Sequence, residues 1–158
     1  MIETAFFDID GVLTDGSVYV DSSGNELKRL YFVDIDALFE LKRAQIQLGF
    51  ITGEEGGFCD YVRARFAPKF FITGCKDKRA AFEQLLGSHS IGLDTTCYVG
   101  DSRKDIELLR YVPLSFAPAD ADEPVKQAAR IVLRARRGEG VIREVADYCL
   151  SKVTTNLI

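Results

Sequence analysis

Short apolar runs alternate along the chain with segments whose apolar residues recur every three or four positions. The short runs are typical of buried β-strands, and the spaced segments are typical of amphipathic helices. Their regular alternation predicts an α/β fold with a parallel sheet flanked by helices. The expected strands span residues 4–7, 46–51, 70–73, 96–99, 113–116 and 131–133, and the expected helices span about 35–45, 56–66, 78–87, 103–111, 121–129 and 139–152.

One segment interrupts this alternation. Residues 17–32, SVYVDSSGNELKRLYF, contain two strand-like runs around a Ser-Ser-Gly-Asn turn, which predicts a β-hairpin inserted after the first strand. No internal repeat, low-complexity tract or linker divides the sequence. We therefore expect a single domain over residues 1–158, with a hairpin flap at about 17–32 and a C-terminal tail at about 134–158.

Composition narrows the class of protein. The chain has 158 residues, of which 47% are hydrophobic and 28% charged, and its net charge is −4. This balance argues against nucleic-acid and membrane partners, and no apolar run approaches the roughly 20 residues of a membrane helix. The first residues already form a strand-like stretch, so no signal peptide is expected. The four cysteines are scattered without a CxxC pair, which predicts reduced thiols in a cytoplasmic protein and no zinc site.

Polar residues follow four of the expected strands at the points where they end. Asp8 and Asp10 follow the first strand, Thr52 follows the second, Lys78 opens the helix after the third, and Asp101 follows the fourth. These side chains should meet at one edge, because the carboxyl ends of parallel strands lie together. The like charges of Asp8 and Asp10, separated by one residue, are tolerable there if a divalent cation and a lysine lie between them. Taken alone, AFFDIDGVLTDG is equally compatible with a strand and an Asx-rich turn.

The ordered motifs DxDGVLTDG, ITGE, DK and GDxxxD resemble the haloacid dehalogenase (HAD) phosphohydrolases over about residues 4–150. The small size, the hairpin and RRGEGVIREV near the C-terminus are similar to the cap-less phosphatases of 3-deoxy-ulosonic acids. These act on 3-deoxy-D-manno-octulosonate 8-phosphate (KDO 8-phosphate) or on the nine-carbon KDN 9-phosphate. The resemblance implies a Rossmann-like HAD fold without a cap domain, a sugar-acid phosphate substrate, Mg²⁺ as cofactor and a homotetramer.

The resemblance also implies a role for each strand-end residue. Asp8 would attack phosphorus to form an aspartyl-phosphate, and Asp10 would act as general acid and then as general base. Thr52 and Lys78 would hold the phosphoryl group. Mg²⁺ would be bound by Asp8, by the backbone carbonyl of Asp10 and by Asp101, a set of oxygen ligands that suits a hard cation.

Other residues would support the chemistry or bind the sugar. Asp105, one helical turn after Asp101, would orient Lys78 or a metal-bound water, and the Gly53 amide would lie close to the phosphate. The resemblance implies that Glu54, after ITG, favours a nine-carbon sugar, whereas the octulosonate enzymes tend to have Arg there. In RARRGEGVIREV, Arg137 and Gly138 would bind the sugar carboxylate, unless this segment is a solvated loop.

The sequence departs from the pattern of these relatives at two places, one directly after Asp101 and one after the hairpin. Ser102 follows Asp101 where many relatives have a second aspartate, although GDxxxD is still met. VDIDALF keeps Asp34 but lacks two glycines that would let the backbone approach the substrate, so sugar recognition is expected to differ here. The phosphoryl chemistry does not depend on either position.

Two alternative functions stay open at the level of sequence. The chain resembles the non-catalytic HAD-like domains that are fused to acylneuraminate cytidylyltransferases and promote assembly. The sequence keeps all the residues expected to carry the chemistry, Asp8, Asp10, Thr52, Lys78 and Asp101, and this argues against an inactive module. Phosphoryl transfer to another acceptor, as in phosphomutases, is less favoured because no substantial cap excludes water.

Overall fold

The main sheet has six parallel strands in the order β5-β4-β1-β6-β7-β8. The computed structural model describes residues 1–154, and of residues 152–154 only the backbone, so the last four residues of the predicted tail lie outside it. The strands of this sheet are β1 Thr4–Phe7, β4 Gln47–Ile51, β5 Phe70–Ile72, β6 Thr96–Val99, β7 Leu114–Ala117 and β8 Ile131–Val132. The helices are α1 Phe32–Arg43, α2 Gly57–Phe66, α3 Lys78–His89, α4 Ile106–Tyr111, α5 Glu123–Ala128 and α6 Val141–Thr154, with short 3-10 turns η1 Leu93–Thr95 and η2 Arg103–Asp105.

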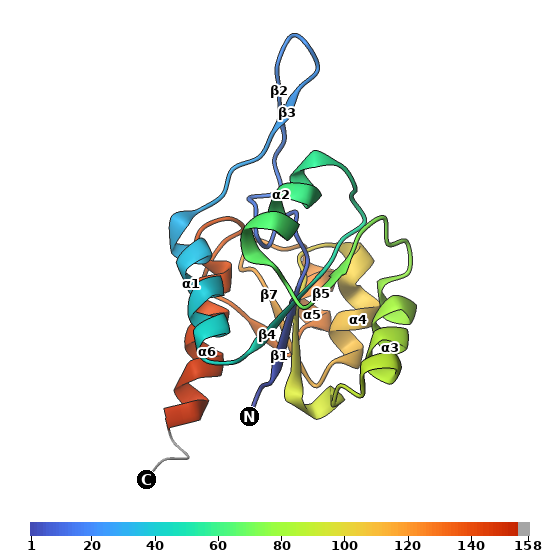
Figure 1. Cartoon of the computed structure of the whole chain (residues 1–158), viewed down its shortest axis with the longest axis vertical. Helices are drawn as coiled ribbons and strands as arrows, with labels where there is room; N and C mark the ends of the chain where they lie inside the picture. Colours follow the sequence, from blue (N-terminus) through green and yellow to red (C-terminus); the bar gives the residue numbers. More distant parts are fainter. Residues whose placement is uncertain (155–158) are drawn as a thin grey trace.

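The sheet is buried on both faces, and each face has its own hydrophobic core. Successive residues of a strand point to opposite faces, so Phe7 packs with α1, α2 and α6 while Phe6 packs with α3, α4 and α5. Figure 1 shows α1 and α6 side by side at one side of the sheet and α3, α4 and α5 at the other. The predicted α/β fold with a parallel sheet is confirmed. A single domain over the whole chain stays a prediction.

The chain order creates one crevice at the carboxyl edge of the sheet. From β1 the chain adds β4 and β5 on one side, and then returns to add β6, β7 and β8 on the other. Parallel sheets bind ligands where the order reverses in this way, because the loops after the two neighbouring strands diverge. The loops after β1 and β6 therefore frame the expected site.

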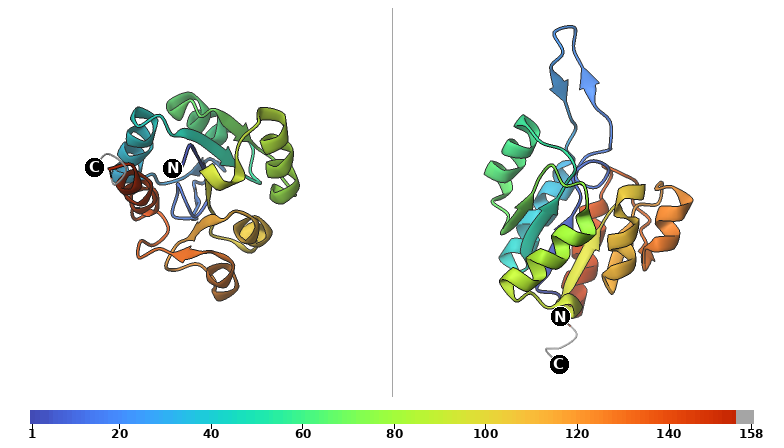
Figure 2. Two further views of the ribbon diagram at one scale, coloured as in Figure 1. Left: turned by 90° about the horizontal axis from the view of Figure 1, so that it is seen from below. Right: turned by 90° about the vertical axis from the view of Figure 1, so that its right-hand side faces the viewer.

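The hairpin projects from the carboxyl edge of the sheet, away from both cores (Figures 1 and 2). Its strands are short, β2 Tyr19–Val20 and β3 Glu26–Leu27, and the turn is closed by amide and side-chain bonds from Asn25 to Asp21. Within residues 1–154 no larger insertion covers the sheet edge. The inserted element is thus a flap and not a cap domain, as predicted.

The prediction was wrong about where the flap ends. Residues 31–33 are aromatic or β-branched and read locally as strand, yet Phe32 already begins α1, three residues before the expected start. The tertiary context overrides that local preference, because Ile35 and Leu38 continue a helical face into the core shared with α6. The expected helix over 103–111 also divides into η2 and α4, since the Asp105 carboxylate bonds back to the amides of Asp101 and Ser102.

Asp34 has a structural position that the sequence did not reveal. It is fully buried in α1, and its carboxylate accepts hydrogen bonds from the amides of Gly140 at 3.1 Å and Arg143 at 2.9 Å. These amides belong to the start of α6, where a carboxylate satisfies free N–H groups and the helix dipole. Asp34 therefore fixes the segment before α6 and does not line the crevice.

Among the described residues, no helix has both the length and the apolar character that crossing a membrane requires.

Candidate active site

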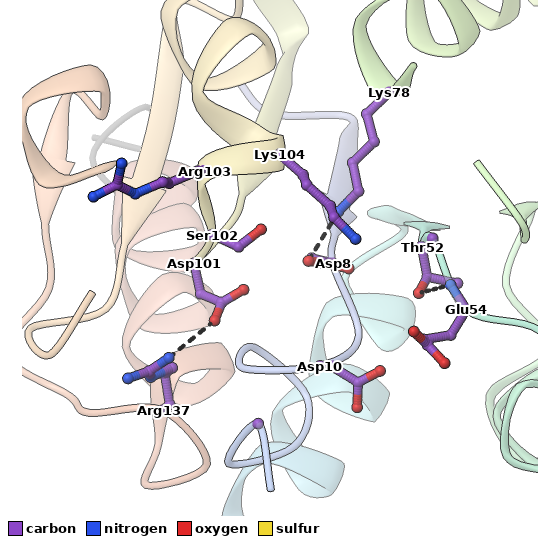
Figure 3. Close-up of a pocket in the computed structure, with 12 residues that line it drawn as sticks. Asp8, Asp10, Thr52, Glu54, Lys78, Asp101, Ser102, Arg103, Lys104 and Arg137 are labelled. Atoms are coloured by element: carbon purple, nitrogen blue, oxygen red, sulfur yellow. Dashed lines mark hydrogen bonds and ion pairs between the residues drawn. The ribbon is translucent and has the colours of Figure 1, made fainter. Parts of the chain in front are cut away.

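A cavity of about 400 Å³ lies at the carboxyl edge of the sheet, where the loops after β1, β4 and β6 meet the start of α3. Figure 3 shows side chains from all four segments turned into this space. Most of the residues predicted from the sequence line it, namely Asp8, Asp10, Thr52, Gly53, Glu54, Lys78, Asp101 and Arg137. Two predicted residues, Asp105 and Gly138, do not line it.

Lys78 is the buried cation of the cavity. Its ammonium lies 2.8 Å from Asp8 Oδ2 and 2.7 Å from Asp105 Oδ1, and its side chain is only 3% exposed. Burial alone would lower the pKa of Lys78, but the two aspartates outweigh burial and the net shift is upward. Lys78 is therefore a permanent positive charge between two carboxylates.

Asp105 lies behind the cavity and is saturated with donors. Its Oδ1 accepts from Lys78 and from the Tyr98 hydroxyl at 2.6 Å, and its Oδ2 accepts from the amides of Asp101 and Ser102 and from the Ser102 hydroxyl. Burial works to raise the pKa of Asp105, yet Lys78 and these hydrogen bonds hold it below the ordinary value. This position agrees with the predicted role of orienting Lys78.

Asp8 and Asp101 carry the opposite pKa shift. Burial raises the pKa of Asp8 to about 7 and that of Asp101 to about 6, and the negative charge of Asp105 adds to both shifts. In the described part of the chain, Asp101 Oδ1 is buried and has no hydrogen-bond partner. Ligand oxygens of Asp8, Asp101 and Asp105 lie within 4.8 Å of one another. These features fit a hard divalent cation, which would compensate the buried charge and use the free oxygen of Asp101.

Gly11 keeps the approach to Asp101 open. Its φ is +86°, and a Cβ at this position would collide with the Asp101 carboxylate. Only glycine therefore allows the loop after β1 to pass so close to Asp101.

Thr52 and Glu54 extend the cavity from β4. The Thr52 hydroxyl oxygen accepts a hydrogen bond from the Glu54 amide at 3.1 Å, which leaves the hydroxyl proton free for a ligand oxygen. The side chain of Glu54 points into the same space as the Asp10 carboxylate (Figure 3). The strand end thus brings one neutral donor and one carboxylate to the cavity.

The segment before α6 reaches the cavity through Arg137. Its guanidinium lies 3.4 Å from Asp101 Oδ2 and 3.4 Å from Asp120 Oδ2, and its backbone amide donates to Asp120 Oδ1 at 2.9 Å. Gly138, with φ +68°, instead packs against the loop after β1, since a Cβ there would lie 2.7 Å from Asp15 Cα. The structure places Gly138 as a packing residue, and its predicted contact with substrate is not supported by this position.

Comparisons with known proteins identify the family of the chain. A family model for haloacid dehalogenase-like hydrolases matches residues 69–145. The chain is 32% identical to the 3-deoxy-D-manno-octulosonate 8-phosphate phosphatase of Haemophilus influenzae over 149 residues, covering 94% of this chain and 83% of the relative. The enzyme of the same name from Escherichia coli K12 is also 32% identical, over 94% of this chain and 79% of the relative. The chain belongs to this phosphatase family of HAD-like hydrolases.

Solved structures of the family have the same fold. The Moraxella catarrhalis phosphatase, in complex with magnesium, phosphate and KDO, has a TM-score of 0.90 at 28% identity, covering 95% of this chain and 86% of that one. The cobalt-bound Haemophilus influenzae enzyme has a TM-score of 0.89 at 31% identity, covering 95% and 88%. The predicted family, HAD fold and class of phosphoric monoester hydrolases are confirmed.

Several residues of the site were missed by sequence reasoning. Gly16, Ser102, Arg103 and Lys104 also line the cavity. The motif GDSRKD contains the last three directly after Asp101, so their position beside a strand end was a usable signal. Tyr98 gave no such signal, because its contact with Asp105 exists only once β6 and η2 have folded.

We expect the metal-free protein to show the cost of ionising Asp101. With a folded pKa of about 6 against an ordinary value of 3.8, folded Asp101 keeps a proton between about pH 4 and 6 that the unfolded chain has lost. The free energy of unfolding therefore falls as pH rises through this window. In EDTA, Asp101→Asn should gain stability relative to wild type from pH 4 to 7, by about 1–3 kcal/mol.

Urea unfolding at several pH values measures this difference. Asp36→Asn, at an exposed position of α1 outside the cavity, is the matched control and should keep the wild-type profile. A difference between Asp101→Asn and wild type that does not change with pH would contradict the raised pKa.

Proposed function

We propose that this chain is a Mg²⁺-dependent phosphatase of a 3-deoxy-2-ulosonic sugar acid, with KDO 8-phosphate or KDN 9-phosphate as substrate. The observation that carries the proposal is the position of Asp8, a buried carboxylate that lines the cavity between Lys78 and Asp101. The relatives are named as KDO 8-phosphate phosphatases, and one of their structures holds magnesium, phosphate and KDO. A cytoplasmic location belongs to the same proposal and agrees with four free thiols.

Asp8 is the nucleophile in this proposal. A carboxylate oxygen of Asp8 attacks phosphorus, and the bond from phosphorus to the sugar oxygen breaks. Asp10 gives a proton to the departing alkoxide, and later takes one from the water that hydrolyses the aspartyl-phosphate. Both carboxylates line one cavity, which is the arrangement that this division of roles needs.

The remaining cavity residues hold the phosphoryl group. Lys78 provides a fixed positive charge next to Asp8, and the Thr52 hydroxyl is free to donate to a phosphoryl oxygen. The Gly53 amide comes from the same loop, and Arg103 and Lys104 add positive charge on the η2 side.

Mg²⁺ would be held by Asp8, Asp101 and the backbone carbonyl of Asp10. A bound Mg²⁺ keeps the carboxylates ionised and offsets the charge that develops on the phosphoryl oxygens. The raised pKa values of Asp8 and Asp101 support this part of the proposal, since burial and the charge of Asp105 disfavour their ionised forms and a bound cation would favour them.

We expect Asp8→Asn to lower kcat by at least about a thousandfold, because an amide cannot attack phosphorus. Phosphate release from KDO 8-phosphate and KDN 9-phosphate measures the loss, and EDTA should abolish wild-type activity until Mg²⁺ is added. Asp36→Asn is again the control and should retain activity. Wild-type protein that hydrolyses no phosphate ester in Mg²⁺ would instead favour the non-catalytic assembly module.

Glu54 is the residue that favours the nine-carbon sugar in this proposal. A carboxylate can accept hydrogen bonds from sugar hydroxyls, and Glu54 lines the cavity with Thr52 and Asp10, on the side where this proposal puts the leaving group. The curated relatives reported above are octulosonate enzymes, so Glu54 is the feature that separates the two candidate substrates.

We expect kcat/KM to be higher for KDN 9-phosphate than for KDO 8-phosphate, and Glu54→Ala to remove most of this preference. A lost hydrogen bond to a carboxylate corresponds to about 1–3 kcal/mol, or about 5- to 150-fold in the ratio. Glu54→Gln keeps an acceptor of the same length and should retain part of the preference. A higher kcat/KM for KDO 8-phosphate, or a ratio unchanged in Glu54→Ala, would contradict this assignment.

We further propose that the chain forms a homotetramer, and the exposed residues of the flap support an assembly between copies of the chain. Val18, Tyr19, Val20 and Leu27 are 48–64% exposed on a hairpin that projects from the molecule. Exposed apolar side chains on a projecting hairpin are typical of a surface that another chain covers. A neighbouring flap would also shield the catalytic cavity from bulk water.

We expect the double variant Val20→Asp, Leu27→Asp to dissociate into smaller species and to lose turnover, because it charges this apolar surface. Light scattering at assay concentration measures the assembly. Ser22→Asp adds a charge to the exposed turn without removing an apolar side chain. It should leave the mass of the assembly, as measured by light scattering, unchanged. A fully active wild-type monomer would rule out the assembly proposal.

A further inference from the structure

Lys28, at the base of the flap, binds the carboxylate of Asp10. It directly follows β3, and its ammonium donates to both Asp10 oxygens at 2.9 Å. The Lys28 side chain is 11% exposed, and its ammonium lies 5.3 Å from the centre of the Phe58 ring. Asp10 Oδ1 also accepts from the Thr14 hydroxyl at 3.2 Å. The group proposed to meet the leaving oxygen is therefore already engaged by the flap.

A second cavity continues from the catalytic one on the flap side. It measures about 390 Å³ and adjoins the catalytic cavity at Glu54, which lines both. Its lining residues come from the flap, the loop after β4 and the start of α2, and are Gly24, Asn25, Glu26, Lys28, Glu54, Glu55, Gly57, Phe58 and Cys59. Among these described residues Lys28 alone is cationic. Three carboxylates, those of Glu26, Glu54 and Glu55, share this lining, so an anionic leaving group that passes Glu54 has Lys28 as its cationic partner there.

The burial of Lys28 restricts what can replace Asp10. A largely buried ammonium that loses its carboxylate leaves an uncompensated charge, which is strongly unfavourable. If Asp10 turns to the leaving oxygen, Lys28 loses hydrogen bonds that another acceptor has to provide. An anionic group on the leaving group provides them most strongly, because charge-assisted bonds are roughly twice as strong as neutral ones.

We propose that Lys28 is a specificity residue that exchanges Asp10 for a carboxylate of the leaving group, and so releases Asp10 when a sugar acid is bound. This inference rests on the proposed function, because it takes the role of Asp10 from there. It adds the reason for preferring an acid over a neutral sugar: a polyol phosphate gives Lys28 no charged partner in exchange.

The neighbouring Arg29 neither contacts Asp10 nor lines the second cavity. Its guanidinium lies 3.6 Å from Asp15 Oδ2, and its side chain is 45% exposed, so it forms a surface pair of small energetic effect. Arg29→Met removes a cation from the same flap base without touching Asp10, and is therefore the matched control for Lys28→Met.

The test uses two substrates of equal chain length, 6-phosphogluconate and sorbitol 6-phosphate, which differ by a carboxylate at the end far from phosphate. We expect Lys28→Met to lower kcat/KM about 10- to 100-fold more for 6-phosphogluconate than for sorbitol 6-phosphate. Lys28→Arg keeps the charge and should retain part of the preference, and Arg29→Met should keep the wild-type ratio. Equal losses on both substrates would overturn the proposal.

A binding measurement tests Lys28 independently of turnover. Calorimetric titration of KDO, in Mg²⁺ and inorganic phosphate, should give a Kd about 10- to 100-fold weaker for Lys28→Met than for wild type, with thermal unfolding as the check of folding. Unchanged affinity for KDO would overturn the proposal. Failure of the proposed function is distinguishable, because wild-type protein would then release no phosphate from either KDO 8-phosphate or KDN 9-phosphate, whereas the titration compares KDO binding by wild type and Lys28→Met without turnover.

Discussion

The site depends on the ion pairs that the Lys78 ammonium forms with Asp8 and Asp105. Three aspartates, all at most 7% exposed, lie at the carboxyl edge of the sheet with ligand oxygens within 4.8 Å of one another. Carboxylates at this separation cannot all be ionised without compensation. Lys78 supplies one positive charge from the first turn of α3. Its ion pairs with Asp8 and Asp105 thereby connect the start of α3 to the loops after β1 and β6.

The surroundings of these carboxylates divide them into two kinds. Asp105 is fully hydrogen-bonded and its pKa is lowered, so it stays ionised and holds Lys78 and the η2 turn. Asp8 and Asp101 have raised pKa values, and Asp101 keeps a buried oxygen without a partner in the described residues. Residues that are alike in sequence thus have different chemistry, because Asp105 is saturated with donors from the protein, whereas Asp101 keeps an oxygen that a cation could use.

The flap differs from the sheet in its packing. The sheet is covered by hydrophobic cores on both faces, whereas the hairpin has two-residue strands and apolar side chains in solvent. Its inward side carries Lys28 to Asp10, and its outward side presents Val20 and Leu27. The residues proposed to hold phosphate thus lie at the ends of core strands and at the start of α3, whereas Asp10, proposed to meet the leaving sugar, is bonded to a segment outside the core.

The sequence by itself determined the parallel sheet, most element boundaries to within two residues, and the residues at the strand ends. These features are local: a strand followed by Asp8, Thr52 or Asp101 is visible in one short window, and parallel pairing brings the windows together. Tertiary structure decided what depends on distant partners. Asp34 bonds to an amide 106 positions away, and Lys28 reaches Asp10 across 18 positions. Such contacts leave no periodic signal, because only the packing of α1 on α6 and of the flap on the sheet edge creates them.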